Sequence, residues 1–286
     1  MSRSSKSDAS VLLTVFNREY EVILSCLRSL ARSLSPSDEV IIVNDGSTMD
    51  YSGVQGYAAR VLPCASKWID MPDYEAYRIA GGFNNPAKAF NEALENASRP
   101  NLYVMSSDVI VTPNCVKRVK RCDLSEMAWV SLVIDIDTGA QYCGPTRLFP
   151  APWFLACSTE HARACGGWDE EYLKGLCYED NDFMGRIMLQ TGRFLGDWTV
   201  AVYHQSHPQP AYEVSDPDIA AANARNREYT LAKWSGIPWA GGQDSCFDVT
   251  RKPFKTGDMI HECKYYDDKL EKVIASTNSP FVVTSV

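Results

Sequence analysis

The 286-residue sequence has no apolar run that approaches the ~20 residues needed to cross a bilayer. Residues 1–10 are polar and lack the apolar core of a signal peptide, so we expect a flexible segment there. None of the ten cysteines stands in a Cys-x-x-Cys pair, which disfavours a zinc cluster or a thioredoxin-like redox site. These absences predict a soluble protein with reduced thiols, in the cytoplasm and without integral membrane association.

Positive charge is also scarce. The chain carries 28 lysines and arginines against 36 acidic residues, a formal net charge of −8. This balance disfavours broad binding to a nucleic-acid backbone or to an anionic membrane. The densest basic run, over residues 117–121, is more simply a solvated helix face.

Short apolar runs alternate with amphipathic segments over the first two thirds of the chain, which is typical of an α/β domain. Val11–Phe16 and Val40–Val43 are predicted to be buried strands. Apolar residues recur at three- and four-residue steps over 22–34, which indicates an amphipathic helix between them. Further strands are predicted at 102–105, 129–134 and 199–203, and further helices after Asn85-Pro86, from Glu179 and over 218–234.

We therefore expect a mixed, mainly parallel, Rossmann-like sheet flanked by helices over residues 11–209. Residues 210–286 change in character and are predicted to be a mainly helical or irregular extension packed on that domain.

Polar clusters follow directly after four of the predicted strands. In open α/β sheets, ligands bind beyond the carboxyl ends of the strands, so the shared placement of these clusters indicates one binding site. They are Asn17-Arg18, Asn44–Ser47, Ser106–Asp108 and His204.

The clusters resemble the motifs of family 2 glycosyltransferases of the GT-A fold. Residues 14–18 and 40–47 are similar to the first two strand ends of that family, and residues 166–171 and 179–183 resemble its acceptor-side motif. The motifs follow in the same order from about residue 11 to 207. The resemblance implies an enzyme that moves a sugar from a nucleoside-diphosphate sugar, a UDP-sugar, to an acceptor hydroxyl.

The resemblance also implies roles in donor binding. Asp45 would bind the nucleoside, because a carboxylate accepts hydrogen bonds from uracil or ribose. Alternatively, Asp45 serves the tight turn in which it lies, Arg18 is a surface charge, and Lys88 is a solvated residue in the first turn of its helix. The implied donor-binding residues are Thr14, Phe16, Arg18, Asp45, Lys88 and Ser107.

The metal motif departs from the family pattern. The family usually has Asp-x-Asp after the third strand, whereas this sequence has Ser106-Ser107-Asp108, so the first carboxylate is missing. Asp108 remains as a ligand for a divalent cation, to which the diphosphate supplies further oxygens. The resemblance implies His204 as the second protein ligand, and its imidazole favours Mn²⁺ over Mg²⁺. His207 is the weaker candidate.

Transfer requires a base that takes the proton of the acceptor hydroxyl. Asp180 stands where the family keeps this base, with Glu179 supporting it or contacting the acceptor, and the transfer would invert the anomeric centre. Acids at a helix N-terminus are otherwise explained by the helix dipole. Trp153 and Trp168 could stack on an acceptor sugar or pack in the core.

Two other functions stay open. A nucleotidyltransferase would share the Rossmann-like sheet, although it would need a glycine-rich loop after the first strand. A noncatalytic protein that binds nucleotide sugars or carbohydrates would fit the loss of the first metal carboxylate at Ser106. The acceptor could be a glycan, a small molecule, a protein or a modified nucleic acid.

Overall fold

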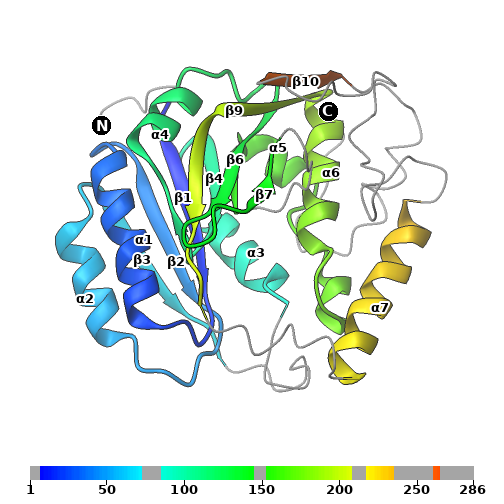
Figure 1. Cartoon of the computed structure of the whole chain (residues 1–286), viewed down its shortest axis with the longest axis horizontal. Helices are drawn as coiled ribbons and strands as arrows, with labels where there is room; N and C mark the ends of the chain where they lie inside the picture. The colour runs from blue at the N-terminus through cyan, green and yellow to red at the C-terminus, as the bar shows by residue number, and fades with distance from the viewer. Residues whose placement is uncertain (1–6, 73–84, 145–152, 208–216, 235–259, 265–286) are drawn as a thin grey trace.

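The computed structural model describes residues 7–72, 85–144, 153–207, 217–234 and 260–264. Within these residues, a ten-stranded sheet forms the centre of the protein (Figure 1). Its main path has the strand order β10-β9-β6-β8-β4-β1-β2-β3, with β5 paired to β9 and β7 to β6. The strands are β1 (Ala9–Val15), β2 (Glu39–Asn44), β3 (Ala65–Asp70), β4 (Asn101–Ser106), β5 (Val109–Ile110), β6 (Ala128–Asp135), β7 (Gln141–Cys143), β8 (Phe154–Ser158), β9 (Arg193–His204) and β10 (Ile260–Lys264).

Most of the long strands run in the same direction. β3, β2, β1 and β4 are parallel neighbours, and β6 and β9 are parallel to each other. β8 lies between β4 and β6 and is antiparallel to both, so β6 and β9 point the same way as β4. The prediction of a mixed, mainly parallel α/β sheet is confirmed.

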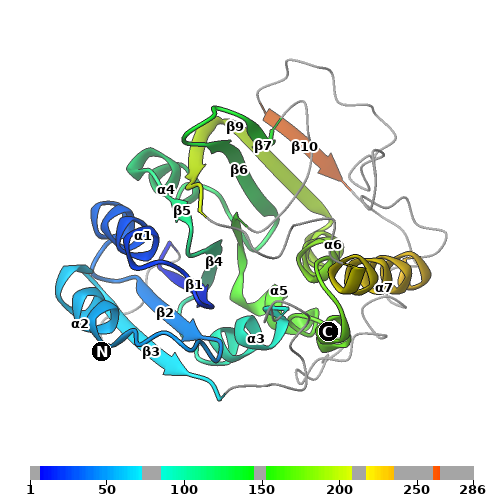
Figure 2. The ribbon, with the colours of Figure 1, turned by 60° about the horizontal axis from the view of Figure 1, so that its bottom comes forward.

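Helices cover both faces of the sheet. Contacts place α1, α2 and α4 on one face and α3, α5 and α6 on the other, and Figure 2 shows the two layers. In the parts of the chain described here, no helix is both long and apolar enough to cross a membrane. The helices are α1 (Tyr20–Ser33), α2 (Ser52–Val61), α3 (Ala87–Glu95), α4 (Pro113–Val119), α5 (Thr159–Ala164), the 3₁₀ helix η2 (Glu170–Lys174), α6 (Glu179–Thr191) and α7 (Pro217–Lys233).

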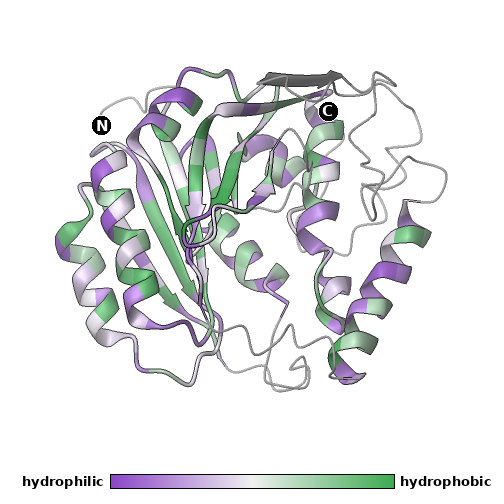
Figure 3. Cartoon of the chain, in the orientation of Figure 1, coloured by the Kyte–Doolittle hydropathy of each residue, from purple (hydrophilic) through white to green (hydrophobic). Residues whose placement is uncertain are grey.

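Local sequence accounts for much of this arrangement. The apolar stripe of α1 buries Ile23, Leu27 and Leu30 against the sheet, as its spacing predicts. The hydroxyl of Thr112 caps the start of α4, and Ser158 caps α5 in the same way. Figure 3 shows the resulting pattern, with apolar residues along the central strands and mixed polarity on the helices.

Two strands begin earlier than the sequence pattern indicates. β1 starts at Ala9, whose backbone N–H donates a hydrogen bond of 2.9 Å to Oδ1 of buried Asp38. Ala9 and Ser10 therefore belong to a buried strand and not to a flexible segment. β9 starts at Arg193. It pairs with β6 along two stretches, one before and one after a register shift, and both stretches belong to the same strand.

α7 packs against η2 and lies beside α6 (Figures 1 and 2). β9 and β10 pair antiparallel at the end of the strand order. Its buried residues include Ile219, Asn226 and Thr230. The rest of the segment 210–286, apart from 217–234 and 260–264, lies outside the described residues.

Candidate donor and metal site

The polar strand ends meet at one edge of the sheet. The register places Thr14 of β1 beside Ser106 of β4, and Val15 of β1 beside Asn44 of β2. The end of β9 is placed there as well, because the backbone N–H of Gln205 donates a 2.9 Å hydrogen bond to the carbonyl oxygen of Asp108. The clusters that follow separate strands in the sequence therefore lie along the same edge.

The loops after β1 and β2 are hydrogen-bonded to each other. Asn17, in the left-handed region at φ 42°, accepts a 2.9 Å hydrogen bond on Oδ1 from the N–H of Thr48. Its own N–H donates to the hydroxyl of Ser47 at 3.0 Å. The Tyr51 hydroxyl donates to the carbonyl oxygen of Arg18 at 2.7 Å. These contacts fix the backbone on which the donor-binding candidates stand.

Asp45 is 4% exposed and is not the residue that stabilises the turn after β2. That role belongs to Asn44, whose Oδ1 accepts the N–H of Ser47 at 3.2 Å. Burial raises the pKa of Asp45 to about 6, although the positive charge of Lys88 opposes the shift. The structure thus brings the Lys88 ammonium into electrostatic range of a buried carboxylate at the sheet edge.

Asp108 lies at the centre of a cluster with two histidines. Its Oδ2 is 3.0 Å from Nε2 of His207 and 3.9 Å from Nε2 of His204. The candidate ligand atoms of all three residues lie within 4.8 Å of one another. The structure therefore brings together the two predicted ligands, Asp108 and His204, and adds His207, the weaker candidate from the sequence.

Arg18 also joins this cluster. Its Nη2 is 3.3 Å from Oδ2 of Asp108, and its Nη1 contacts Nδ1 of His207. Burial favours the neutral form of Asp108, but the hydrogen bond to His207 and the nearby cationic groups outweigh burial and hold its pKa below the usual range. With a side chain that is 22% exposed, Arg18 is part of the site and not a free surface charge.

The donor set fits a divalent cation. Oδ1 of Asp108 is buried and has no hydrogen-bond partner among the described residues, so it is an acceptor that a cation would satisfy. Nδ1 of His204 is 3.4 Å from Oδ2 of Asp135, which leaves Nε2 of the same ring directed toward Asp108. Metal-binding histidines commonly have such a carboxylate behind them. One carboxylate and two imidazoles suit Mn²⁺ better than Mg²⁺.

The remaining donor-side candidates lie around this cluster. Ser106 helps to hold the pKa of Asp108 below its usual range, so this serine supports the carboxylate instead of supplying a second one. Ser107 is buried between β4 and β5, whereas Thr14 and Phe16, at the end of β1, are partly exposed.

Glu179 and Asp180 begin α6 and are tied to the donor side through α3. Nδ2 of Asn85 donates a 2.7 Å hydrogen bond to Oε2 of the buried Glu179, and Oδ1 of Asn85 caps Ala87 at the start of α3. Asp180 is less buried, and its Oδ1 accepts the N–H of Asn181. Burial raises the pKa of both carboxyls, and the charge of Asp180 raises the pKa of Glu179 further.

The two tryptophans predicted to contact the acceptor have different environments. The fully buried ring of Trp168 stacks on Phe183, with centroids 3.6 Å apart, and on Phe90 at 4.8 Å. Acceptor binding by Trp168 is therefore not supported, because the indole packs in the core with no exposed face. Trp153 is partly exposed, and its ring centroid lies 5.6 Å from that of His204.

Asp135 behind His204 is not among the residues predicted for the site, although the sequence carries a signal for it. Asp135 ends the strand predicted over 129–134, so the strand-end rule that found Asp108 applies to it equally. The contact between Asn85 and Glu179 has no such signal, because it joins two helix starts that are 94 residues apart.

Comparison with known proteins agrees with this geometry. Residues 10–121 match the family model described as glycosyl transferase family 2. No curated protein matches the sequence significantly. Among solved structures, residues 1–349 of TarS from S. aureus, in complex with UDP-GlcNAc, align with a TM-score of 0.61 and 15% identity. That alignment covers 78% of this chain and 66% of TarS 1–349.

Two further structures share the fold. The mannosyltransferase PcManGT from Pyrobaculum calidifontis, in complex with GDP-Man and Mn²⁺, aligns with a TM-score of 0.58 and 16% identity, over 78% of this chain and 64% of that one. GalNAc-T7 with UDP, GalNAc and Mn²⁺ gives 0.55 and 14%, over 82% of this chain and 53% of that one. This chain thus spans slightly less than two thirds of the first of these relatives and less of the others. Residues 10–121 thus resemble family 2 glycosyltransferases, and the chain shares the GT-A fold of these solved structures.

Proposed function

We propose that this protein transfers a sugar from a nucleoside-diphosphate sugar, a UDP-sugar, to an acceptor hydroxyl with inversion at the anomeric carbon. The observation that carries the proposal is the cluster of Asp108, His204 and His207 on the sheet edge that also bears buried Asp45. The complexes of TarS with UDP-GlcNAc and of GalNAc-T7 with UDP support a uridine donor.

Asp45 and Lys88 are proposed to bind the donor. A buried carboxylate can accept hydrogen bonds from the ribose or the base while a cation balances its negative charge. Lys88 lies in the first turn of α3, and the N-terminus of a helix favours the charge of a phosphate. Thr14, Phe16 and Ser107 are proposed to line the same pocket.

Asp108, His204 and His207 would hold a divalent cation, proposed to be Mn²⁺. When bound, such a cation neutralises the charge that develops on a departing nucleoside diphosphate. Asp135 would keep the His204 ring in the orientation that directs Nε2 to the ion. Arg18 adds a fixed positive charge to the same edge.

Asp180 is proposed to be the base. It takes the proton of the acceptor hydroxyl while the acceptor oxygen forms a bond to the anomeric carbon and the bond from that carbon to the diphosphate breaks. Burial raises the pKa of Asp180, which makes the carboxylate a stronger base than an exposed one. Asn85 holds Glu179 beside it, and the partly exposed Trp153 is the proposed contact for the acceptor.

The protein is proposed to work in the cytoplasm. The eight cysteines whose side chains the structure describes are free thiols, which suits a reducing compartment.

Donor screening tests the proposed function. Thermal stability would be measured with UDP- and GDP-sugars, with and without Mn²⁺, and release of nucleoside diphosphate would be followed in parallel. We expect a UDP-sugar to stabilise the protein more with Mn²⁺ than without it, because a ligand that binds only the folded state raises apparent stability. Stabilisation by a donor without any release of nucleoside diphosphate, with or without acceptor glycans, would instead support the noncatalytic alternative.

A further inference from the structure

The segment that leads into α6 has an unusual backbone. Cys177 and Tyr178 both lie in the left-handed region, at φ 61° and 74°, although neither is glycine. Tyr178 is the N-cap of α6 and its side chain makes no capping hydrogen bond. Residues in this region keep such a conformation only when their surroundings hold them. The direction in which α6 presents Glu179 and Asp180 therefore depends on what holds this segment.

Asn226 of α7 is one of the groups that hold it. Its side chain is fully buried, and Nδ2 donates 2.9 Å hydrogen bonds to the carbonyl oxygens of Tyr172 and Cys177. The same helix accepts the N–H of Leu176 on the carbonyl oxygen of Ala222, at 3.1 Å. α7 thus contacts the segment through both a side chain and the backbone.

The fit at this contact is tight. A Cβ placed on Gly175 would lie 2.4 Å from Oδ1 of Asn226 and 2.6 Å from the carbonyl oxygen of Ala222. Oδ1 of Asn226 also accepts a 2.7 Å hydrogen bond from Nη1 of Arg225. Both ends of the Asn226 amide are therefore committed, and the side chain has one orientation that satisfies them.

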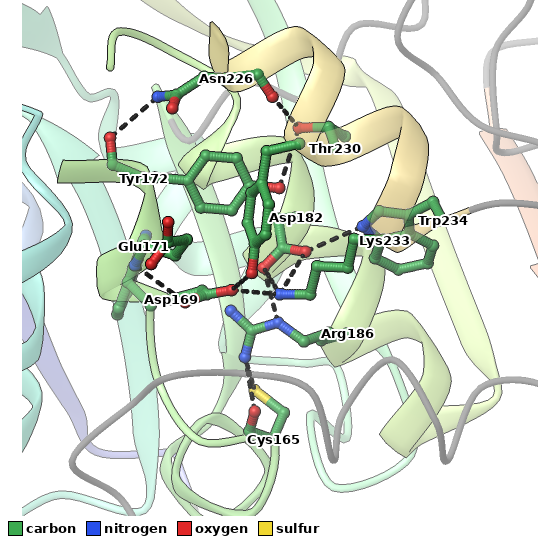
Figure 4. A network of polar contacts seen from close by, with 12 residues as sticks. Cys165, Asp169, Glu171, Tyr172, Asp182, Arg186, Asn226, Thr230, Lys233 and Trp234 are labelled. Atoms are coloured by element: carbon green, nitrogen blue, oxygen red, sulfur yellow. Dashed lines mark hydrogen bonds and ion pairs between the residues drawn. The ribbon is translucent and has the colours of Figure 1, made fainter. Parts of the chain in front are cut away.

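The other end of α7 is anchored separately, as Figure 4 shows. Nζ of Lys233 lies 2.6 Å from Asp169 and 3.0 Å from Asp182, and Nε1 of Trp234 donates to Asp182 at 2.9 Å. Asp182 in turn pairs with the buried Arg186 at 2.8 Å. This buried charge network docks α7 on the body of α6, whereas Asn226 contacts the backbone just before α6.

We propose that Asn226 is a positioning residue, which fixes Cys177 and Tyr178 so that Asp180 faces the acceptor hydroxyl. The inference rests on the proposed role of Asp180 as the base. It assigns to α7, which lies outside the segment matched by the family model, a part in the transfer step. Small displacements of a catalytic group lower the rate without lowering the affinity for a substrate that binds elsewhere.

The test compares Asn226→Ala with Lys233→Met at a temperature where both variants are folded. Both substitutions loosen α7, but only the first removes the hydrogen bond to the carbonyl of Cys177. We expect Asn226→Ala to lower kcat by about 10-fold to 100-fold with the donor KM unchanged, and Lys233→Met to keep kcat near that of the native protein. Asn226→Asp, which keeps the size but donates no hydrogen bond when ionised, should match Asn226→Ala and serves if the alanine variant does not fold.

The same substitution in an Asp180→Asn background separates this inference from the proposed function. If Asn226 acts through Asp180, Asn226→Ala lowers the residual rate of Asp180→Asn by far less than it lowers the native rate. An unchanged kcat in Asn226→Ala, an equal loss in Lys233→Met, or equal losses in both backgrounds overturns the positioning role. Full activity of Asp180→Asn alone would instead remove Asp180 as the base.

Discussion

Asn85 donates a 2.7 Å hydrogen bond from Nδ2 to Oε2 of Glu179 across 94 residues of sequence. The bond joins the start of α3, where the positive charge of Lys88 acts on Asp45, to the start of α6, where Asp180 lies. The groups proposed to bind the donor and the group proposed to activate the acceptor are therefore held on one connected frame.

Replacing Asp180 with asparagine should lower kcat by about 100-fold or more, because a positioned base contributes 10²–10⁴-fold to such a step. Thermal stabilisation by the donor should be unchanged, since the side chain does not belong to the proposed donor pocket. Glu228→Gln is a matched acid-to-amide control on the exposed face of α7 and should keep full activity. If the Asp180→Asn variant were as active as this control, Asp180 would be excluded as the base.

The pH dependence of kcat should have its acid limb above the range of an ordinary carboxyl, whose pKa is about 4. The base works in its deprotonated form, and burial raises the pKa of Asp180, so activity is retained above that raised pKa and lost as the pH falls through it. Steady-state rates measured at saturating donor and acceptor would show the limb. A limb at the value of an exposed carboxyl would argue that Asp180 is not the titrating group.

Donor affinity should depend on the ionisation of Asp45. Its pKa is raised to about 6 by burial, and only the carboxylate accepts hydrogen bonds on both oxygens. Affinity should therefore be full above that pKa and weaken as the pH falls through it. Titration calorimetry with the donor at several pH values would measure this, and Asp45→Asn should bind weakly at every pH. If the pH dependence persists in Asp45→Asn, another group causes it.

Asp135→Asn should weaken Mn²⁺ binding by about 10-fold to 100-fold, since carboxylates behind metal-binding histidines have effects of this size. Asn can keep the Oδ1 contacts to the turn at Thr138 but loses the charge next to Nδ1 of His204. Binding of Mn²⁺ would be followed by electron paramagnetic resonance of the free ion. Asp137→Asn is the control, because that side chain is exposed two positions further along. Equal affinities in the two variants would contradict the arrangement.

Lys233→Met should lower the free energy of unfolding by about 3 kcal/mol, because it leaves buried carboxylates without their cation. Nζ of Lys233 is 2.6 Å from Asp169, and the Lys233 side chain is 2% exposed. Lys174→Met removes an ion pair to Glu171 from a side chain that is 60% exposed, so it should change stability by less than about 1 kcal/mol. Denaturant unfolding compares the two variants, and similar losses would show that the buried network contributes little.

Much of the fold can be predicted from the sequence because the signals of its helices and strands are local. The spacing of Ile23, Leu27 and Leu30 predicts the helix α1, and a short apolar run predicts the buried strand β2. β3 and α2 carry weaker signals and were not predicted: the strand Ala65–Asp70 is half-exposed, and the helix Ser52–Val61 buries few side chains. The antiparallel strand β8 was also not predicted, because a short apolar run indicates neither the direction of a strand nor its neighbours in the sheet.

By itself, the sequence determined that polar residues follow buried strands, and hence that Asp45, Asp108 and His204 share one edge of a sheet. That conclusion needs only the geometry of parallel strands. The tertiary structure decided that Arg18 and His207 join Asp108, that Trp168 is enclosed in the core, and that Asn226 of α7 holds the backbone before Asp180. These facts depend on contacts between segments far apart in the chain. Packing and burial determine the role of each of these side chains, and residue type alone does not predict it.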